Sequence, residues 1–381
     1  MNEKPKKKSL FSREELLRYS RQITLSEFGY ESQVRLKESS VLCVGAGGLG
    51  SSIILYLASA GVGKIGIIDN DIVELSNLHR QVIHNNFSIG KLKTNSAKQR
   101  IHEINPNCEV QLFNETLDSN NALEIIKKFN YICDGSDNFP TKYLVNDACV
   151  ILGKPMIYGS IYKFEGQVSV FNLNKNSPNY RDLIPEPPPN GMIPSCAEGG
   201  VLGILPGIIG LIQATETIKL ITKLGENLDG RLLVFDALNM KFKELKFERS
   251  NPQIKINKLI DYKEFCGIKD VYKDNYDQIS CKDLKKIIDI NSKNLFLIDV
   301  RSQLEREIDY IKNSVSIPLE NIKDNSKISL IKGKNNEGKK IILYCKSGIR
   351  SLEALNHLKN NNIICKSLEG GLDNWNNFIF S

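Results

Sequence analysis

Short apolar segments alternate with amphipathic ones over much of the chain. An apolar run at 41–44 leads into a glycine-rich turn at 45–50, an apolar helical stretch follows at 51–60, and a second strand is expected at 64–68. Further short apolar runs occur at 131–133, 156–158 and 167–171. Strands that alternate with helices in this way are typical of a parallel sheet covered by helices on both faces. The pattern therefore predicts a doubly wound α/β domain.

A proline-rich stretch interrupts this alternation. Residues 185–191 read Pro-Glu-Pro-Pro-Pro-Asn-Gly, and proline both fixes φ and lacks the amide hydrogen that a helix or a central strand needs. We therefore expect an exposed loop here. A glycine-containing apolar helix at 205–224 and two closing strands at 232–235 and 242–247 complete the domain.

A second α/β pattern follows a polar stretch without periodicity. It begins with a helix around 283–290 and continues with strands at 295–300 and 340–344, the last of which ends at Cys345. The predicted organisation is a disordered leader at 1–12, a first domain at 13–248, a linker at 249–277 and a second domain at 278–381. The predicted fold class is α/β, with a doubly wound Rossmann-like domain and a small second α/β domain.

The composition limits the class of protein. A length of 381 residues suits two domains, because a single core rarely extends beyond ~250–300 residues. No apolar run reaches the ~20 residues of a membrane span, and the basic start has no apolar core after it, so neither an integral membrane protein nor a secretory signal is expected. The net charge of +7 is spread along a Lys- and Asn-rich chain without an Arg/aromatic stripe, so direct nucleic-acid binding is not expected.

The nine cysteines indicate a reducing compartment. Their number is odd and no two form a CxxC pair, which argues against a disulfide framework and against a zinc ribbon. Cys196 and Cys345 lie near glycines in polar turns and are the candidates for chemistry. We expect an intracellular protein in the cytoplasm or, because Lys-, Asn- and Ile-rich composition is typical of an AT-rich genome, in a plastid stroma.

The turn at 45–50 has the spacing of a phosphate-binding loop. Gly45, Gly47 and Gly50 follow a strand and open a helix, so a phosphate can approach the backbone and meet the amide groups at the helix N-terminus. Asp69 lies at the end of the next strand, where a carboxylate can accept hydrogen bonds from ribose hydroxyls. This motif alone fits a nicotinamide or flavin enzyme equally well, and a tight turn without a ligand also fits.

Polar and cationic residues beyond Asp69 favour ATP over a dinucleotide. They are Ser76, Asn77, Arg80, Lys93, Asp137 and Asn138. A dinucleotide has only a diphosphate to neutralise, whereas a triphosphate needs several cations and a carboxylate that holds magnesium. Together these residues predict a site for ATP and Mg²⁺.

These motifs resemble those of the molybdopterin-synthase adenylyltransferases and of the related ThiF-type and ubiquitin-activating enzymes. The resemblance covers about 16–247 and includes the segments 18–23, 45–50, 76–81 and 196–200. It implies that ATP is used to adenylate the C-terminal glycine of a small ubiquitin-like sulfur-carrier protein that ends in Gly-Gly. The small subunit of molybdopterin synthase is the expected carrier, and a carrier for thiamine synthesis or tRNA thiolation is the alternative.

The resemblance also implies roles for single residues. Nucleotide contacts carry over to Gly48 and Asp69, phosphate contacts to Asn77, Arg80 and Lys93, and the magnesium contact to Asp137. Arg80 and Asp137 are thus the catalytic candidates of this site. Arg21 would reach the active site of a partner subunit, which implies a homodimer.

One departure from the resemblance concerns zinc. Members of this family often hold a structural zinc ion with two CxxC pairs. Here the corresponding positions are Asn179, Asp182, Ile254 and Asn257, so all four thiols are absent. Zinc in structural sites is bound by thiolates and imidazoles, which this set lacks. We therefore expect no zinc.

Cys345 follows a strand and precedes a glycine turn that opens a helix. The amide groups of such a turn, the helix dipole and Arg350 would stabilise a thiolate or a persulfide anion. The four-residue spacing between Cys345 and Arg350, with the flanking segments 297–301, 317–318 and 368–375, resembles a rhodanese domain. Asp299 and Arg301 are interpreted as structural. The resemblance implies that Cys345 carries a persulfide, loaded by a sulfur donor such as a cysteine desulfurase.

Cys196 is a second candidate thiol, just after the proline-rich loop. In relatives the corresponding cysteine is implicated in thioester or acyl-disulfide chemistry, so Cys196 would attack the acyl-adenylate or resolve a disulfide; a passive loop thiol is the alternative. The residues also leave two other functions open. One is a nicotinamide oxidoreductase with a regulatory second domain, and the other is a non-catalytic scaffold whose second domain only binds a partner.

Overall fold

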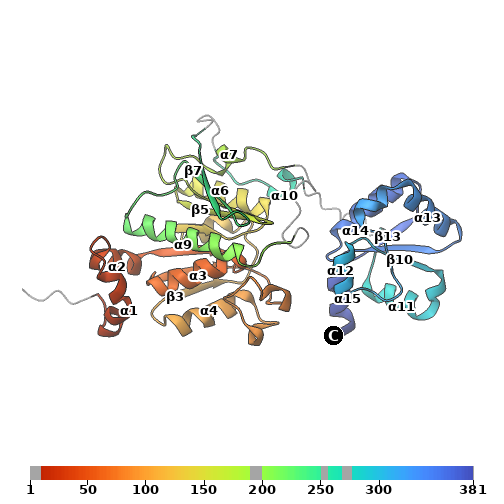
Figure 1. Ribbon diagram of the computed structural model, residues 1–381, viewed down its shortest axis with the longest axis horizontal. Helices are drawn as coiled ribbons and strands as arrows, with labels where there is room; N and C mark the ends of the chain where they lie inside the picture. Colours follow the sequence, from red (N-terminus) through yellow and green to blue (C-terminus); the bar gives the residue numbers. More distant parts are fainter. Residues whose placement is uncertain (1–9, 189–199, 250–255, 268–276, 381) are drawn as a thin grey trace, which may run out of the picture. The chain divides into compact units, whose positions relative to one another are not determined.

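The chain forms two compact units, described here one at a time. The computed structural model describes residues 10–188, 200–249, 256–267 and 277–380. The first unit ends at Ile268 and the second begins at Lys269. In Figure 1 the first unit runs from red through green to teal, and the second from cyan to blue.

The first unit is built on an eight-stranded sheet with the order β3-β2-β1-β4-β5-β6-β7-β8. The pairs from β3 through β5 are parallel and those from β5 through β8 are antiparallel. The strands are β1 (Ser40–Val44), β2 (Lys64–Ile68), β3 (Glu109–Phe113), β4 (Tyr131–Asp134), β5 (Met156–Tyr162), β6 (Glu165–Phe171), β7 (Arg231–Asp236) and β8 (Lys241–Lys246). The chain leaves β1 towards β3 and returns to the other side of β1 at β4. Ligands of such sheets bind at this reversal, beyond the carboxyl ends of the strands.

Helices cover both faces of this sheet because each central strand is apolar on both sides. In β1, Val41 and Cys43 join one apolar cluster, whereas Leu42 and Val44 join the other. The helices and short 3-10 turns are α1 (Arg13–Ile23), α2 (Gly29–Glu38), α3 (Gly48–Ala60), η1 (Leu75–Asn77), η2 (Asn86–Ser88), α4 (Lys93–Ile104), α5 (Ala122–Ile126), α6 (Phe139–Leu152), α7 (Tyr180–Leu183), α9 (Leu205–Thr222) and α10 (Tyr262–Phe265). Helices α2, α3, α4 and α9 supply the first cluster, and α5, α6, α7 and α10 the second. The predicted doubly wound fold is confirmed.

Two segments differ from the sequence prediction at the borders of the first unit. Within the predicted leader, Phe11 is only 4% exposed and its ring meets the edges of Tyr19 and Tyr30. Within the predicted linker, α10 packs into the second apolar cluster, where Tyr262 is buried. Both segments are too short to show a periodic apolar pattern, so only their tertiary contacts reveal that they belong to the folded unit.

The second unit has a five-stranded parallel sheet with the order β11-β10-β12-β13-β9. Its elements are β9 (Gln278–Ile279), α11 (Cys281–Asn291), η5 (Ser292–Asn294), β10 (Leu295–Asp299), α12 (Gln303–Ile308), β11 (Val315–Ser316), η6 (Leu319–Lys323), α13 (Asn325–Asn336), β12 (Lys340–Tyr344), α14 (Ile349–Asn360), β13 (Cys365–Leu368) and α15 (Gly371–Phe380). Two apolar clusters fill its two faces. The central strand β12 ends at Cys345, as predicted. Within the described parts of the chain, no helix combines the length and apolar character needed to cross a membrane.

Candidate functional site

The turn between β1 and α3 requires glycine for steric reasons. Gly45 has φ of 92°, a left-handed conformation that L side chains rarely adopt. A Cβ on Gly50 would lie 2.0 Å from the Gly45 carbonyl oxygen. Gly47 and Gly48, at the start of α3, carry no side chains of their own and line a cavity. An anion can therefore approach the first amide groups of this helix.

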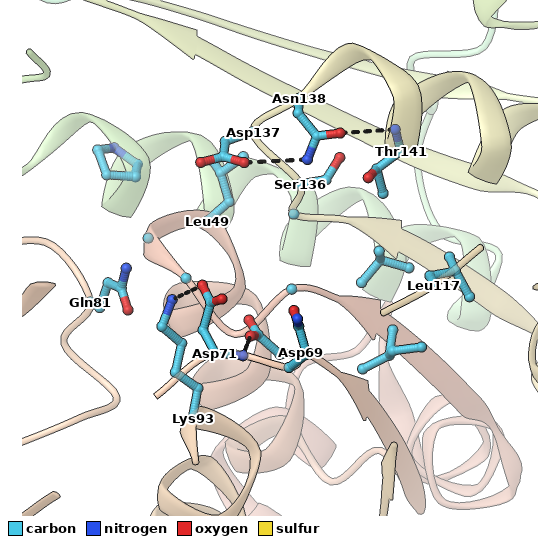
Figure 2. A pocket seen from close by; sticks show the side chains of 18 of the residues that line it. Leu49, Asp69, Asp71, Gln81, Lys93, Leu117, Ser136, Asp137, Asn138 and Thr141 are labelled. Carbon is cyan, nitrogen blue, oxygen red and sulfur yellow. Dashed lines mark hydrogen bonds and ion pairs between the residues drawn. The ribbon is translucent and has the colours of Figure 1, made fainter. Parts of the chain in front are cut away.

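A cavity of about 390 Å³ opens beside this turn, at the carboxyl ends of β1, β2 and β4. The predicted residues that line it are Gly45, Gly47, Gly48, Asp69, Arg80, Lys93, Asp137 and Asn138. In Figure 2, Asp69, Asp71 and Lys93 lie on one wall, and Asp137 and Asn138 on the opposite wall. The structure thus brings eight predicted residues, far apart in sequence, to one polar cavity.

Four other predicted residues do not line the cavity. Gly50 acts through the turn itself, and Arg21 is exposed on the last turn of α1. The Ser76 hydroxyl donates to Glu74, and Asn77 accepts the Glu74 amide with its side chain, so both shape the 3-10 turn η1. Their role in this structure is to hold the segment that presents Arg80.

Asp69 is tied to the phosphate-binding loop. Its Oδ2 accepts the Ala46 amide at 2.8 Å, and its Oδ1 accepts the Asp71 amide at 2.8 Å. Burial raises the pKa of Asp69, although nearby Lys93 opposes this effect. Each carboxylate oxygen can accept a second hydrogen bond. Asp69 can therefore bind ribose hydroxyls while it fixes the loop.

The cationic groups of the cavity are held in different ways. Lys93 Nζ lies 2.7 Å from Asp71 Oδ2; the lysine side chain is 8% exposed and the aspartate 62%. Arg80 donates to the Ser76 carbonyl at 2.9 Å and is half-buried. Because Asp71 is solvated, the Lys93 charge can turn to a phosphate at low cost.

Asp137 and Asn138 are neighbours on the cavity wall but differ in their contacts. Asn138 caps α6, since its side chain accepts the Thr141 amide at 3.0 Å. Asp137 is exposed on the cavity wall. Among the described residues its carboxylate has one long contact, 3.5 Å from Asn138 Nδ2. Asp137 is therefore available for a cation, whereas Asn138 orients the turn.

The thiol of Cys345 lies at the N-terminus of α14 in the second unit. It is 1% exposed, and its Sγ accepts the Gly348 amide at 3.1 Å and the Ser351 hydroxyl at 3.6 Å. Gly348 has φ of 96° and forms the N-cap of this helix. Amide and hydroxyl donors at a helix N-terminus can hydrogen-bond to an anionic sulfur. The turn thus has the features of a site for anionic sulfur.

Arg350 makes a bidentate ion pair with Glu305, with N–O distances of 2.8 and 2.7 Å. Burial raises the pKa of Glu305, but Arg350 and Ser302 outweigh that effect and lower it to about 2. The predicted contribution of Arg350 to the thiol site therefore depends on an ion pair that the sequence did not reveal. Asp299 and Arg301 form a separate buried pair at 2.7 Å, in agreement with a structural role.

Comparison with known proteins assigns each of the two units to a family. The model of the ThiF family matches residues 19–256, and that of the rhodanese-like domain matches 280–378. The chain belongs to the ThiF family. It is 45% identical to the "Probable adenylyltransferase/sulfurtransferase MoeZ" of Mycobacterium tuberculosis, over 96% of this chain and 94% of that protein. It is 41% identical to the "Adenylyltransferase and sulfurtransferase MOCS3" of Drosophila yakuba, over 96% and 84%.

Further similarities agree with this assignment. The "Probable molybdopterin-synthase adenylyltransferase" of Porphyra purpurea is 40% identical over 97% of this chain and 95% of that protein. Escherichia coli MccB, solved with MccA-N7isoASN, superposes with a TM-score of 0.57 at 22% identity, over 65% of this chain and 75% of MccB, which shows the fold. The ThiF-family chain is an ATP-using adenylyltransferase with a sulfurtransferase domain. ATP-dependent adenylation of a sulfur-carrier protein with rhodanese sulfur transfer is thereby confirmed as its class of reaction.

Two of the positions at which ThiF-family proteins often bind zinc serve here to cap a short helix. Asn179 and Asp182 form a capping box at α7: the Asn179 side chain accepts the Arg181 amide, and Asp182 accepts the Asn179 amide at 2.8 Å. Ile254 lies outside the described residues. No cluster of three or more His, Cys, Asp or Glu side chains that could hold a metal occurs in the described part of the chain. With all four thiols of the family's zinc site absent from the sequence, a zinc-free domain stays a prediction.

Sequence reasoning missed Lys142, a buried residue that supports one wall of the cavity. Lys142, buried on α6, donates to Asp134 Oδ2 at 2.9 Å, to the Ser136 carbonyl at 2.9 Å and to the Gly159 carbonyl at 2.8 Å. These bonds fix the turn that carries Asp137. A lysine in a mostly apolar helix was the available signal, because a buried ammonium needs partners. Cys196, the other candidate thiol, lies outside the described residues.

Proposed function

We propose that this chain adenylates the C-terminal glycine of a small ubiquitin-like carrier ending in Gly-Gly, and that Cys345 then delivers sulfur to it. The carrier we favour is the small subunit of molybdopterin synthase, in line with the name of the Porphyra relative. The observation that carries the proposal is the cavity itself, in which a glycine turn, two cations and a carboxylate converge. A thiol held by amide donors in the same chain supplies the second step.

The first step forms the acyl-adenylate. The carrier carboxylate attacks the α-phosphorus of ATP, the bond to the β-phosphate oxygen breaks and pyrophosphate leaves. In this proposal the loop amides near Gly48, with Arg80 and Lys93, stabilise the negative charge that develops on the phosphates, and Asp69 binds the ribose. Mg²⁺ fits Asp137, whose exposed carboxylate faces the cavity, and would supply further charge neutralisation when bound.

The second step transfers sulfur. The terminal sulfur of a Cys345 persulfide attacks the acyl carbon, and AMP leaves as the carbon–oxygen bond breaks. The resulting acyl disulfide is cleaved when a second thiolate attacks Cys345 Sγ, which releases the carrier thiocarboxylate. We assign this attack to Cys196; the Cys196–Cys345 disulfide that forms is then reduced by an external thiol.

The partners follow from the same proposal. A cysteine desulfurase or a similar donor loads Cys345, and a homodimer would allow the exposed Arg21 to reach the cavity of the other subunit. The segment between the two units would act as a linker. Cytoplasm or plastid stroma is the proposed location, on the strength of the thiol-rich composition.

ATP–pyrophosphate exchange with purified carriers tests the first step. Exchange that depends on the molybdopterin synthase small subunit is the expected result; exchange only with a carrier of thiamine synthesis or tRNA thiolation would redirect the pathway. Hydride transfer without any exchange would overturn the proposal. For the second step, Cys345→Ala should retain exchange and form no thiocarboxylate, whereas Cys365→Ala, a buried thiol on β13, serves as the matched control.

A further inference from the structure

His84 is a buried histidine that connects the phosphate-binding loop to α4. It is 6% exposed and is not among the residues that line the cavity. Its Nε2 lies 2.9 Å from the Ala46 carbonyl oxygen, and its Nδ1 lies 2.9 Å from Ser96 Oγ. Because a carbonyl oxygen only accepts, Nε2 carries the proton and Nδ1 accepts from the Ser96 hydroxyl. The two contacts thus define one neutral tautomer.

The neutral form is the stable one at physiological pH. Burial lowers the pKa of His84 to about 4, an effect that the bond to Ala46 opposes and that the charge of Lys93 reinforces. His84 is therefore a fixed hydrogen-bonding group under working conditions and does not exchange protons with substrate.

The bond from His84 determines the direction of a loop amide. A trans peptide group is planar, so its carbonyl and its N–H point in opposite directions. The Ala46 carbonyl shares such a group with the Gly47 amide, and Gly47 lines the cavity. With the carbonyl held by His84, the Gly47 N–H must point away from the imidazole. The preceding peptide group is fixed as well, because the Ala46 amide donates to Asp69.

The other side of the imidazole reaches the helix that begins with Lys93. Ser96 lies three residues after Lys93 and therefore on nearly the same face of α4. Lys93 pairs with Asp71, whose amide donates to Asp69, whose carboxylate holds Ala46. A chain of hydrogen bonds thus links the loop, the proposed ribose-binding carboxylate and Lys93. His84 links the loop to the helix that carries Lys93 by a second and shorter route.

We propose that His84 is a positioning residue for adenylation, which orients the Gly47 amide and sets the distance from the loop to Lys93. The inference rests on the proposed binding of ATP at this loop. It assigns His84 a function although the residue does not touch the nucleotide.

Two isosteric substitutions separate positioning from packing. In His84→Gln the amide nitrogen takes the place of Nε2 and can still donate to Ala46. In His84→Asn the shorter amide corresponds to Nδ1 and reaches only Ser96. We expect His84→Asn and His84→Leu to weaken ATP binding about tenfold, with kcat reduced less than KM is raised, and His84→Gln to stay within about threefold of wild type.

Direct ATP binding to the full-length protein, measured by calorimetry without a carrier, is the primary readout, so failure to find the carrier does not affect it. His102→Leu, an exposed position on α4, is the matched control, and melting temperatures report the folding of each variant. Equal ATP affinities for the Gln and Asn variants, or affinities that follow melting temperature alone, would overturn the proposal. Wild-type protein that binds no ATP would overturn the proposed function instead.

Discussion

Replacing Glu305 with Gln should destabilise the second unit, because this carboxylate on α12 forms an ion pair with Arg350 on α14. Glu305 accepts two hydrogen bonds from Arg350 and two from Ser302, at 2.7 to 3.0 Å. A pKa of about 2 in place of the usual 4.5 corresponds to about 3 kcal/mol in favour of the charged form. The side chain is 25% exposed, so solvent screening lowers this figure, and we expect a loss of about 2 kcal/mol.

The single tryptophan makes this loss measurable in the full chain. Trp375 is buried in the second unit, and the sequence contains no other tryptophan. Its fluorescence during urea unfolding therefore reports this unit alone. With an m value of about 2 kcal/mol/M, Glu305→Gln should shift the midpoint by about 1 M at pH 7. Glu307→Gln, at a neighbouring exposed position, is the control and should leave the midpoint unchanged.

The pH dependence gives an independent check. A carboxyl group with a lowered pKa stabilises the folded state fully above its unfolded value, and this contribution is lost as the pH falls through the folded value. For Glu305 the contribution is present above about 4.5 and disappears between pH 4.5 and 2. The difference between wild type and Glu305→Gln should shrink over this interval. Equal midpoints at pH 7, or a difference that is as large at pH 2.5 as at pH 7, would refute the reasoning.

Three further changes have defined outcomes. Lys142→Met leaves the buried Asp134 carboxylate unpaired and should cost about 3–5 kcal/mol in thermal or urea unfolding, with Lys142→Arg closer to wild type. Gly50→Ala places a Cβ 2.0 Å from the Gly45 carbonyl and should reduce ATP affinity at least tenfold by calorimetry. Cys345→Ala should abolish thiosulfate sulfurtransferase activity while pyrophosphate exchange continues.

The parts of the structure that sequence predicts well are those with local causes. The glycine turn at 45–50 and the strand that ends at Cys345 follow from the alternation of apolar segments and from the steric demands of a strand–helix turn. Both therefore appear in the structure where the sequence places them. The same reasoning predicts that Asp69 and Lys93 belong to the site. Asp69 follows the end of β2 and Lys93 begins α4, and strand ends and helix starts meet at one edge of a parallel sheet.

The parts that sequence does not predict depend on partners far along the chain. Tyr262 packs into the second apolar cluster, and its buried hydroxyl donates to Asp147 at 2.7 Å, a residue 115 positions earlier. Glu305 and Arg350 are 45 positions apart, and His84 reaches back 38 positions to Ala46. No local propensity indicates such pairs, since each polar residue reads equally well as a solvated surface group. Their roles become visible only when the fold shows which distant groups they contact.

The two units use one structural device for two chemistries. In each, a parallel strand ends in a turn with a left-handed glycine, Gly45 or Gly348, and the next helix directs its first amides at the turn. In the first unit the turn at 45–50 consists mostly of glycine, and a phosphate of a ligand can approach its amides. In the second unit the first residue of the turn is Cys345, and the amide of Gly348 is already occupied by sulfur from the chain itself. In the proposed function a ligand supplies the anion in the first unit, whereas in the second unit the sulfur belongs to the chain, so the same backbone geometry suits both an ATP site and a sulfur site.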